Sequence, residues 1–189
     1  MTTTELDDAT LVGRARDGDV RAYEQLVLRY QAPMFRLAVK MFNHRGDAED
    51  VVQEVFLGAW RKLAQLQGDS AFVGWLYRST ANRCLNVIRA RRPQADVDLE
   101  LAESPRTDGR PEHAAQVNGQ LEALNGQLEA LNAALQQLTP PQRVCWLLRE
   151  VHGRSYDEIA EVVGVNAAAV RGRIARARAQ LAEVMKPWR

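Results

Sequence analysis

The chain has 189 residues, a length that suits one or two small domains, each able to bury its own core. Its 25 Lys and Arg nearly balance its 24 Asp and Glu, so a net charge of +1 gives no direct sign of a polyanionic partner. Apolar runs of only a few residues exclude a membrane-spanning helix, and we expect no stable membrane insertion. The polar start MTTTELDD lacks the features of a signal peptide, which predicts a cytoplasmic protein.

The periodicity of apolar residues is helical nearly throughout, with no alternating strand, so we predict an all-α protein. In the first half, the helices are expected at about residues 8–16, 20–42, 47–66 and 69–90. Pro33 lies inside the second of these and predicts a kink or an early break. The acidic residues that open the third favour the positive end of a helix.

A polar segment divides the chain. Pro93 to Pro111 contains three prolines and a glycine, which is typical of a linker. We assign residues 1–93 to a first domain, 94–117 to a flexible acidic linker and 118–189 to a second domain. The helical pattern resumes near Glu112 and continues to about 138. A further helix then follows Thr139-Pro140-Pro141, and two short helices complete the chain.

Charge is segregated along the chain. Residues 75–92 contain five arginines and no acid, and residues 166–189 contain six basic residues and one acid. The segment 94–116 between them holds six acids and two arginines. Two basic patches separated by an acidic connector indicate two places where a polyanion is held, against the alternative of solvated helix faces.

The last two predicted helices have the pattern of a helix-turn-helix. Ser155 and Glu158 form a capping box, Gly164 supplies the tight turn and Asn166 caps the next helix. In such a unit the second helix enters the major groove of DNA, where arginine reads guanine or clamps phosphate. The alternative is an ordinary helical hairpin. The candidate DNA-binding residues are Ser155, Asn166, Arg171, Arg173, Arg176 and Arg178.

Two motifs in the first half also carry polar residues in a pattern. In GDAEDVVQEVFLGAW, Asp50, Gln53 and Glu54 share one strip of a helix without a nucleophile, metal cluster or phosphate loop, which favours docking over catalysis. In GDSAFVGWLYRSTANRCLN, aromatic residues alternate with basic and amide residues, a combination that suits unstacked single-stranded bases. For Phe72 and Trp75, the alternative interpretation is that their side chains belong to the core of the domain.

No metal or other cofactor is expected. His44, His113 and His152 are scattered, with no second histidine or cysteine at the spacing of metal ligands. Cys84 and Cys145 lie far apart on predicted amphipathic helices, which favours two apolar thiols in a reducing compartment over a disulfide.

Two further motifs follow the linker, LTPPQRVCWLLREVHGRSYDEIAEVVGVN and VRGRIARARAQL. Taken together and in this order, the motifs of the chain resemble those of the bacterial RNA polymerase sigma factors of the extracytoplasmic-function group. The resemblance implies a non-enzymatic subunit that directs core RNA polymerase to promoter DNA and helps to open it. An anti-sigma protein is a further expected partner. The first domain would dock on the clamp helices of the largest polymerase subunit and read the minus-ten element. The helix-turn-helix would read the minus-thirty-five element.

By motif position, the resemblance implies three sets of site residues. Those that dock on the polymerase would be Asp47, Asp50, Gln53 and Glu54. Those that meet minus-ten DNA would be Trp75, Tyr77, Arg78, Asn82, Arg83, Asn86, Arg89 and Arg91, with Asn82 contacting a flipped base. The minus-thirty-five set is the six residues given above. The chain departs from the family at Asn166-Ala167-Ala168-Ala169, where Pro-x-Gly-Thr is frequent, and at Gly172, often serine, so the promoter sequence is not predictable.

Residues 118–138, NGQLEALNGQLEALNAALQQL, repeat a heptad with leucines spaced three and four apart. A duplicated heptad lengthens a helix without turning its apolar face away. Gly119 and Gly126 each cost a helix about 1 kcal/mol relative to alanine, which a dedicated coiled coil would avoid. We therefore favour a lengthened helix within the domain over self-association or a frayed helix. The alternative function is a free-standing helix-turn-helix regulator that dimerises through these leucines.

Overall fold

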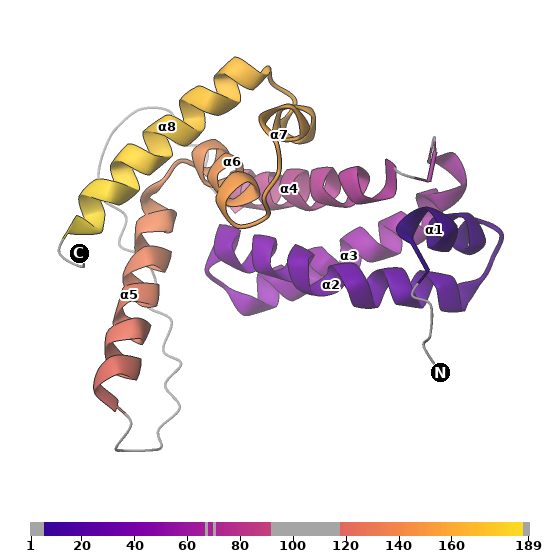
Figure 1. Cartoon of the computed structure of the whole chain (residues 1–189), viewed down its shortest axis with the longest axis horizontal. Coiled ribbons are helices and arrows are strands. Elements are labelled where there is room, and N and C mark those ends of the chain that lie inside the picture. The colour runs from indigo at the N-terminus through magenta and orange to yellow at the C-terminus, as the bar shows by residue number, and fades with distance from the viewer. Residues whose placement is uncertain (1–5, 67, 70, 92–117, 187–189) are drawn as a thin grey trace.

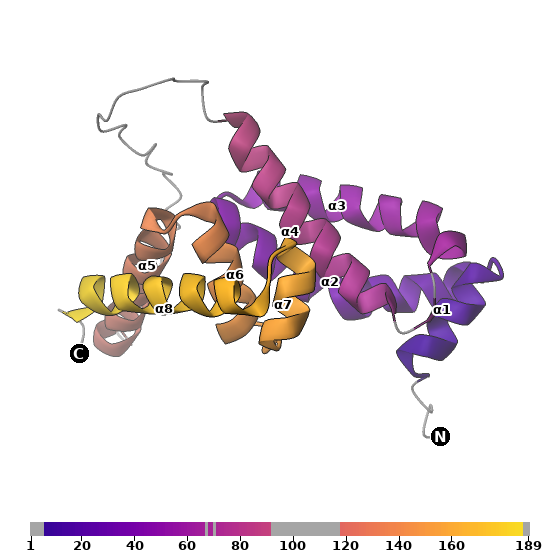
Figure 2. The same ribbon diagram turned by 90° about the horizontal axis from the view of Figure 1, so that it is seen from above.

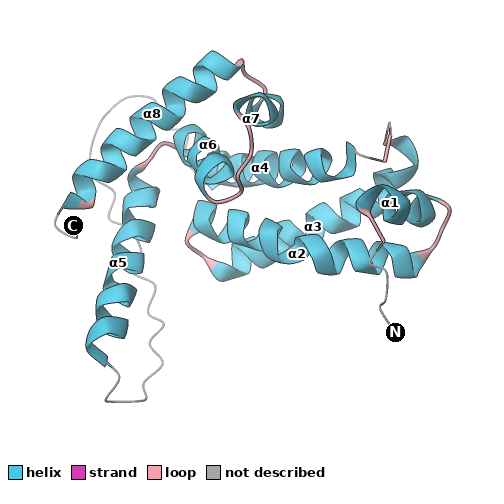
Figure 3. Ribbon diagram, viewed as in Figure 1, coloured by secondary structure: helices cyan, strands magenta, loops and turns pink. Residues whose placement is uncertain are grey.

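The computed structural model of the chain describes residues 6–66, 68–69, 71–91 and 118–186. All regular secondary structure in these ranges is helical, as Figure 3 shows, which confirms the predicted all-α class. The elements are α1 (Asp8–Arg16), α2 (Val20–Phe42), α3 (Arg45–Lys62), the 3-10 helix η1 (Leu63–Gln65), α4 (Ala71–Arg91), α5 (Asn118–Gln137), α6 (Pro140–Glu150), α7 (Tyr156–Val163) and α8 (Ala167–Val184). The predicted linker, 94–117, lies outside the described residues.

The first two helices begin where aspartates cap them. The Asp7 carboxylate accepts a hydrogen bond from the Thr10 amide at 2.8 Å, and Asp19 accepts bonds from two amides of the first turn of α2. Each cap of this kind stabilises a helix by about 1 kcal/mol. Helix α2 continues through Pro33 to Phe42, as its predicted range has it, so of the two alternatives predicted at Pro33 the early break does not occur.

Helix α3 begins two residues before the predicted start. The ring nitrogen Nδ1 of His44 accepts a hydrogen bond from the Asp47 amide at 3.2 Å, so His44 is the N-cap. Asn43, in the left-handed conformation with φ of 53°, makes the turn from α2 to α3. The end of the predicted helix is the separate 3-10 turn η1.

Helices α1 to α4 form the first domain and pack around one apolar core, at the right of Figure 1. Each helix buries one stripe of apolar residues, the arrangement expected of an amphipathic helix in a bundle. The largest fully buried side chains of this core are Leu11, Leu26, Met34, Leu37, Met41, Phe72 and Leu76. Cys84 is also fully buried and Cys145 is buried in the second domain, and both are free thiols, as predicted.

Helices α5 to α8 form the second domain, and α7 and α8 make the predicted helix-turn-helix. The Ser155 hydroxyl accepts a hydrogen bond from the Glu158 amide while the Glu158 carboxylate accepts one from the Ser155 amide, which completes the capping box. Gly164 ends α7 with φ of 68°, a conformation that favours glycine. Asn166 then caps α8 through a 2.8 Å bond from the Ala169 amide. At 18 residues, α8 is longer than the short helix expected.

The leucine stripe of α5 packs inside the chain only near its C-terminal end. Leu135 and Leu138 are buried and Leu131 is partly buried, whereas Leu128 is 53% exposed. The side chains of Leu121 and Leu124 lie outside the described part. In Figure 1, α5 projects away from the rest of the molecule. Because its last leucines belong to the core of the second domain, they cannot also form a seam with another chain, which fits the lengthened helix.

The two domains lie against each other. Helices α5 and α6 contact the C-terminal part of α2, and α6 and α7 contact α4, as Figure 2 shows from above. Helix α6 lies between α8 and the first domain, so α8 is on the outside. None of the helices described is long and apolar enough to cross a membrane.

Candidate functional site

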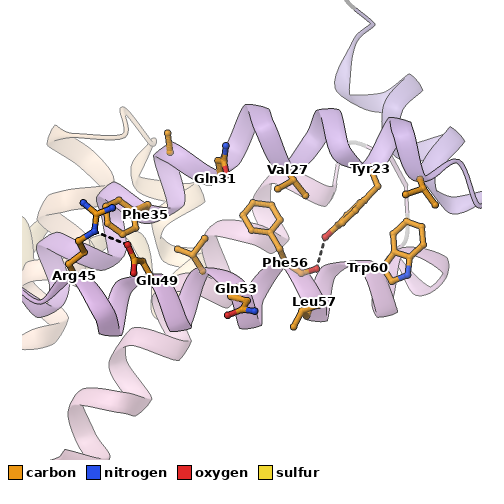
Figure 4. Close-up of a pocket in the computed structure, with 13 residues that line it drawn as sticks. Tyr23, Val27, Gln31, Phe35, Arg45, Glu49, Gln53, Phe56, Leu57 and Trp60 are labelled. Atoms are coloured by element: carbon orange, nitrogen blue, oxygen red, sulfur yellow. Dashed lines mark hydrogen bonds and ion pairs between the residues drawn. The ribbon is translucent and has the colours of Figure 1, made fainter.

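An open apolar groove of about 800 Å³ runs between α2 and α3 on the outside of the first domain (Figure 4). It is lined by apolar and aromatic side chains with a few polar residues at its edges. The lining residues are Val20, Tyr23, Val27, Gln31, Ala32, Phe35, Arg45, Glu49, Val52, Gln53, Phe56, Leu57 and Trp60. We refer to this set as the α2–α3 groove.

The wall of the α2–α3 groove is held in place by Tyr23. Its hydroxyl donates a hydrogen bond of 2.5 Å to the Phe56 carbonyl, and its ring lies 4.8 Å from that of Trp60 between centroids. Burial raises the pKa of Tyr23 to about 12, so the hydroxyl keeps its proton as a donor at neutral pH. Leu57 and Trp60 remain 53% and 39% exposed. Large apolar side chains left open beside a preformed groove are typical of a surface that binds another protein.

Of the four predicted docking residues, one lines this groove and the other three lie elsewhere on α3. Asp50, Gln53 and Glu54, which we call the polar strip, are all exposed on α3, and Gln53 also lines the groove. At one end of the groove Arg45 donates a 2.7 Å hydrogen bond to Glu49. Glu54 forms an ion pair of 2.6 Å with Arg83 of α4. The polar strip thus offers one carboxylate at Asp50 with no ion pair among the described residues.

Asp47 is placed differently from the rest of the docking set. Both of its carboxylate oxygens accept hydrogen bonds from the guanidinium of Arg91, at 2.5 and 2.6 Å. These bonds from Arg91, followed by those from His44, hold the pKa of the Asp47 carboxyl below its usual range. The pair joins the start of α3 to the end of α4. Asp47 was predicted for polymerase docking and Arg91 for minus-ten DNA, but in the structure the two side chains bond to each other.

Helix α4 has two unlike halves. Beyond its middle, the predicted DNA-binding residues Asn82, Arg83, Asn86 and Arg89 are exposed along one side. In the first half, Arg78 is exposed, Trp75 is half-buried and Tyr77 is only 5% exposed. Phe72 is fully buried, which confirms the core alternative for that residue.

The arginines of the recognition helix α8 also differ in placement. Arg171 and Arg176 are exposed, and Arg171 lies over the Tyr156 ring at 5.7 Å. Arg173 is half-buried, while Arg178 is exposed and forms a 2.5 Å ion pair with Glu150 of α6. The side chains of Ser155 and Asn166 act as helix caps.

Sequence reasoning missed the α2–α3 groove. None of its residues Tyr23, Val27, Phe56, Leu57 and Trp60 was assigned to a site. The signal was present in α3, where VVQEVFLGAW places apolar residues on more than one side of the helix. A helix that is apolar on two sides in a small domain needs a second partner for one of them.

Comparison with known proteins decides the family. Residues 26–94, which span most of α2 through α4, match the model of sigma-70 region 2, and residues 128–181 match that of sigma-70 region 4. The RNA polymerase sigma-H factor of Pseudomonas aeruginosa is 38% identical, over 97% of this chain and 96% of that protein. The chain belongs to the sigma-70 family. The ECF RNA polymerase sigma-E factor of Escherichia coli, 36% identical over 97% of this chain and 96% of that protein, places it in the extracytoplasmic-function group.

Two solved structures are similar in three dimensions. CnrH, solved in complex with the cytosolic domain of CnrY, has 28% identity and a TM-score of 0.71, over 95% of this chain and 97% of that one. The sigma factor RpoE of Bartonella quintana, solved with the anti-sigma factor NepR, shares the fold at 23% identity and a TM-score of 0.65, over 88% of this chain and 98% of that one.

The function of the chain is accordingly that of an RNA polymerase sigma factor in transcription initiation. Its relatives are initiation factors rather than enzymes. These comparisons do not favour the alternative of a free-standing regulator that dimerises through the α5 leucines.

Proposed function

We propose that the polar strip and the α2–α3 groove bind the clamp helices of core RNA polymerase. The observation that carries this proposal is an open apolar groove flanked by exposed carboxylate and amide side chains on one helix of region 2. A groove of this kind accepts the apolar side chains of a helix, while the polar rim sets its register. Asp50 and Glu54 would attract basic residues of the partner and speed the encounter.

Promoter DNA would bind at two places, one in each domain. On α4, the exposed side chains of Arg78, Asn82, Arg83, Asn86 and Arg89 form a basic and amide-rich face. An amide at Asn82 can read the edge of a base only after that base leaves the stack, so this face acts in the melted state. Trp75 and Tyr77 would supply stacking surfaces once they are uncovered.

In the second domain, α8 would enter the major groove at the minus-thirty-five element. Arg171 and Arg176 are exposed and form no ion pair within the described part of the chain, which suits them to contact DNA. Arg178 is also exposed but is paired with Glu150, and Arg173 is half-buried, so we assign these two to supporting the helix and contacting the phosphate backbone at its edge. Ser155 and Asn166 would set the positions of the two helix starts, whose amides face phosphate in such units.

The remaining assignments follow from the family. We infer a non-enzymatic, cytoplasmic subunit with a first domain at 1–93, a linker at 94–117 and a second domain at 118–189. Core RNA polymerase and promoter DNA are its partners, and an anti-sigma protein is its inhibitor. The last inference is supported by the similarity to CnrH, which was solved with the cytosolic domain of CnrY.

Reconstituted holoenzyme tests this function. The chain is mixed with core polymerase and used to select duplexes from a random DNA library, followed by transcription of the selected templates. We expect two conserved elements separated by a fixed spacer and transcripts that depend on the chain. Selection of one element by the chain without polymerase would instead support a free-standing DNA-binding regulator.

A further inference from the structure

An arginine of α1 holds the segment that joins α3 to α4. We call the described residues of this segment, 63–66 and 68–69, the α3–α4 connector. Arg16, the last residue of α1, donates hydrogen bonds of 3.3 Å from Nε to the Leu63 carbonyl and from Nη2 to the Leu66 carbonyl. Nη2 also forms an ion pair of 2.7 Å with the Asp69 carboxylate. One guanidinium therefore fixes three points along the connector.

These contacts follow from the ends of the helices. Carbonyl groups at the end of a helix lack partners within it and carry partial negative charge, so they favour a cation. Leu63 is buried in the core, whereas the backbone at Leu66 is already extended, with φ of −69° and ψ of 122°. The planar guanidinium of Arg16 spans both carbonyls at once, which the single ammonium of a lysine cannot do in the same way.

The connector borders the part of α4 that is assigned to minus-ten DNA. Leu66 lines a cavity of about 410 Å³ together with Trp75 and Arg78 of α4. The far side of this cavity is formed by the second domain. On the near side, Trp75 offers a ring for stacking, Arg78 offers hydrogen-bond donors and Leu66 offers an apolar wall. Such a combination suits an unstacked base, and Asn82 lies one helical turn beyond Arg78 along α4.

The position of this apolar wall depends on what anchors the connector. Leu66 lies beyond the end of η1 and before the start of α4, so neither helix fixes its backbone through regular hydrogen bonds. A displacement of about 1 Å in a binding site is enough to lose the fit that discriminates between ligands. Arg16 supplies the anchor from α1, which lies at the end of the first domain where α3 runs into α4 (Figure 1).

We propose that Arg16 is a positioning residue for reading the minus-ten element. It holds the α3–α4 connector so that Leu66, Trp75 and Arg78 form one pocket for an unstacked base. This inference rests on the assignment of α4 to minus-ten DNA given above. Arg16 lies before residues 26–94, which match region 2, so that match gives it no role. Helix α1 thereby contributes to base specificity without touching the DNA.

The test uses full-length variants reconstituted with core polymerase. Arg16→Ala removes all three contacts, Arg16→Lys keeps the charge without the planar fork, and Asp69→Asn removes only the ion pair. Arg14→Ala is the matched control, because it removes another arginine of α1 whose ion pair with Asp19 does not involve the connector.

Two readouts are taken on every variant. The templates derive from the promoter that the wild-type holoenzyme selects, with the minus-ten element randomised and the minus-thirty-five element fixed. Each template carries a transcribed barcode, so sequencing the transcripts gives the base preference at every position. Hydrogen exchange of the free chains reports whether the connector loosens, since the Leu66 amide bonds the Leu63 carbonyl within it.

We expect Arg16→Ala to speed exchange in the connector and to lower the base preference about fivefold at one or two adjacent positions of the minus-ten element. Arg78→Ala should affect the same positions, because Arg78 shares the pocket with Leu66. Arg16→Lys and Asp69→Asn should give smaller losses there, and Arg14→Ala should match the wild type. All variants should retain binding to core polymerase.

A loss of preference spread evenly over the minus-ten element would overturn the proposal, since it would indicate a general effect on folding or activity. An unchanged preference in Arg16→Ala, or connector exchange equal to that of the wild type, would also overturn it. If Arg16→Ala fails to fold, Arg16→Lys and Asp69→Asn decide by the same criteria. A wild-type holoenzyme without any minus-ten preference, or Arg78→Ala without effect, would instead contradict the assignment of α4, and this proposal with it.

Discussion

The outer face of α3 and the first half of α4 belong to the same small domain, yet they are presented very differently. The α2–α3 groove is open, with Trp60 and Leu57 exposed beside the polar strip. On α4, Tyr77 lies beneath His152 and Arg154 of the other domain. Of the two surfaces for which we propose partners, the one proposed for polymerase is accessible, whereas the one proposed for minus-ten DNA has an accessible half and a half in which Tyr77 is covered.

The largest expected effect concerns the open surface. Asp50→Arg should weaken binding to core polymerase by about 100-fold or more, because it places a positive charge against the basic partner expected there. Asp50 is a better target than Glu54, because Glu54 pairs with Arg83 and Glu54→Arg would place a second positive charge beside that arginine. The measurement is a pull-down with core polymerase. Glu24→Arg, an exposed charge reversal on α2 outside the groove, is the control and should bind normally.

The next effect concerns the exposed half of α4. Asn82→Ala should reduce promoter opening by roughly tenfold, with little change in binding to closed duplex, because a base edge is read only after melting. Permanganate footprinting of the holoenzyme measures opening. Asn86→Ala, one helical turn further along the same exposed side, shows whether the effect is specific. Equal opening by Asn82→Ala and the wild type would make Asn82 a structural residue.

The covered half of α4 should respond to pH through His152. Burial first, and then the charges of Arg36 and Arg154, lower the pKa of His152 to about 4. The chain with its two domains in contact therefore holds His152 in its neutral form. The neutral ring stabilises this contact fully above about pH 6.5, the pKa of the ring when the domains are apart. This stabilisation is lost as the pH falls toward 4. Tyr77, Arg36, Arg154 and the carboxylates Glu158 and Glu161 are the other ionisable groups around it.

Between pH 7.5 and pH 5 the ratio of chains with the two domains in contact to chains with the domains apart should fall at least about tenfold. Energy transfer between dyes at the exposed positions Gln25→Cys and Ala182→Cys, one in each domain, measures this ratio. His152→Asn lacks the titrating ring and should remove most of this dependence. The same pH response in His152→Asn and the wild type would show that carboxylates at the contact, rather than His152, control it.

The smallest effect is expected from α5. Deletion of Asn118 to Leu124 should leave transcription in vitro within about twofold, because one heptad shifts the face of a helix by only about 20°. Leu135 and Leu138 would keep their places in the core. A four-residue deletion rotates the face further and serves as the harsher control. If the wild type sediments as a dimer and the heptad deletion gives an inactive monomer, the self-association reading is correct.

The parts of the fold that local chemistry determines were predictable. Helices α1 and α2 begin beside their capping aspartates, and the Ser155, Gly164 and Asn166 signals located the helix-turn-helix. The start of α3 was missed because the prediction relied on the acidic residues of its first turn, whereas the N-cap is a histidine, an uncommon residue at that position. The caps are local, so sequence alone contains them.

The relation between the two domains was not predictable. Arg143 and His152 lie within the motif that follows the linker, but nothing in that motif predicts their partners, which are more than 70 residues away along the chain. The α2–α3 groove was hidden for a related reason. Apolar residues that line a groove and those that fill a core are the same residue types at the same spacing, so only the packing of neighbouring helices separates them.

The most direct test is to compare hydrogen exchange in the free chain and in the chain bound to core polymerase without DNA. It shows whether the α2–α3 groove binds first and the first half of α4 is uncovered as a result. Peptides from α3 between Glu49 and Trp60 should become protected on binding. Those from the first half of α4 and from the α6–α7 turn at Val151 to Ser155 should exchange faster, because the domains separate. Protection of the turn and of α4 that is unchanged or increased in the complex would contradict the ordered account.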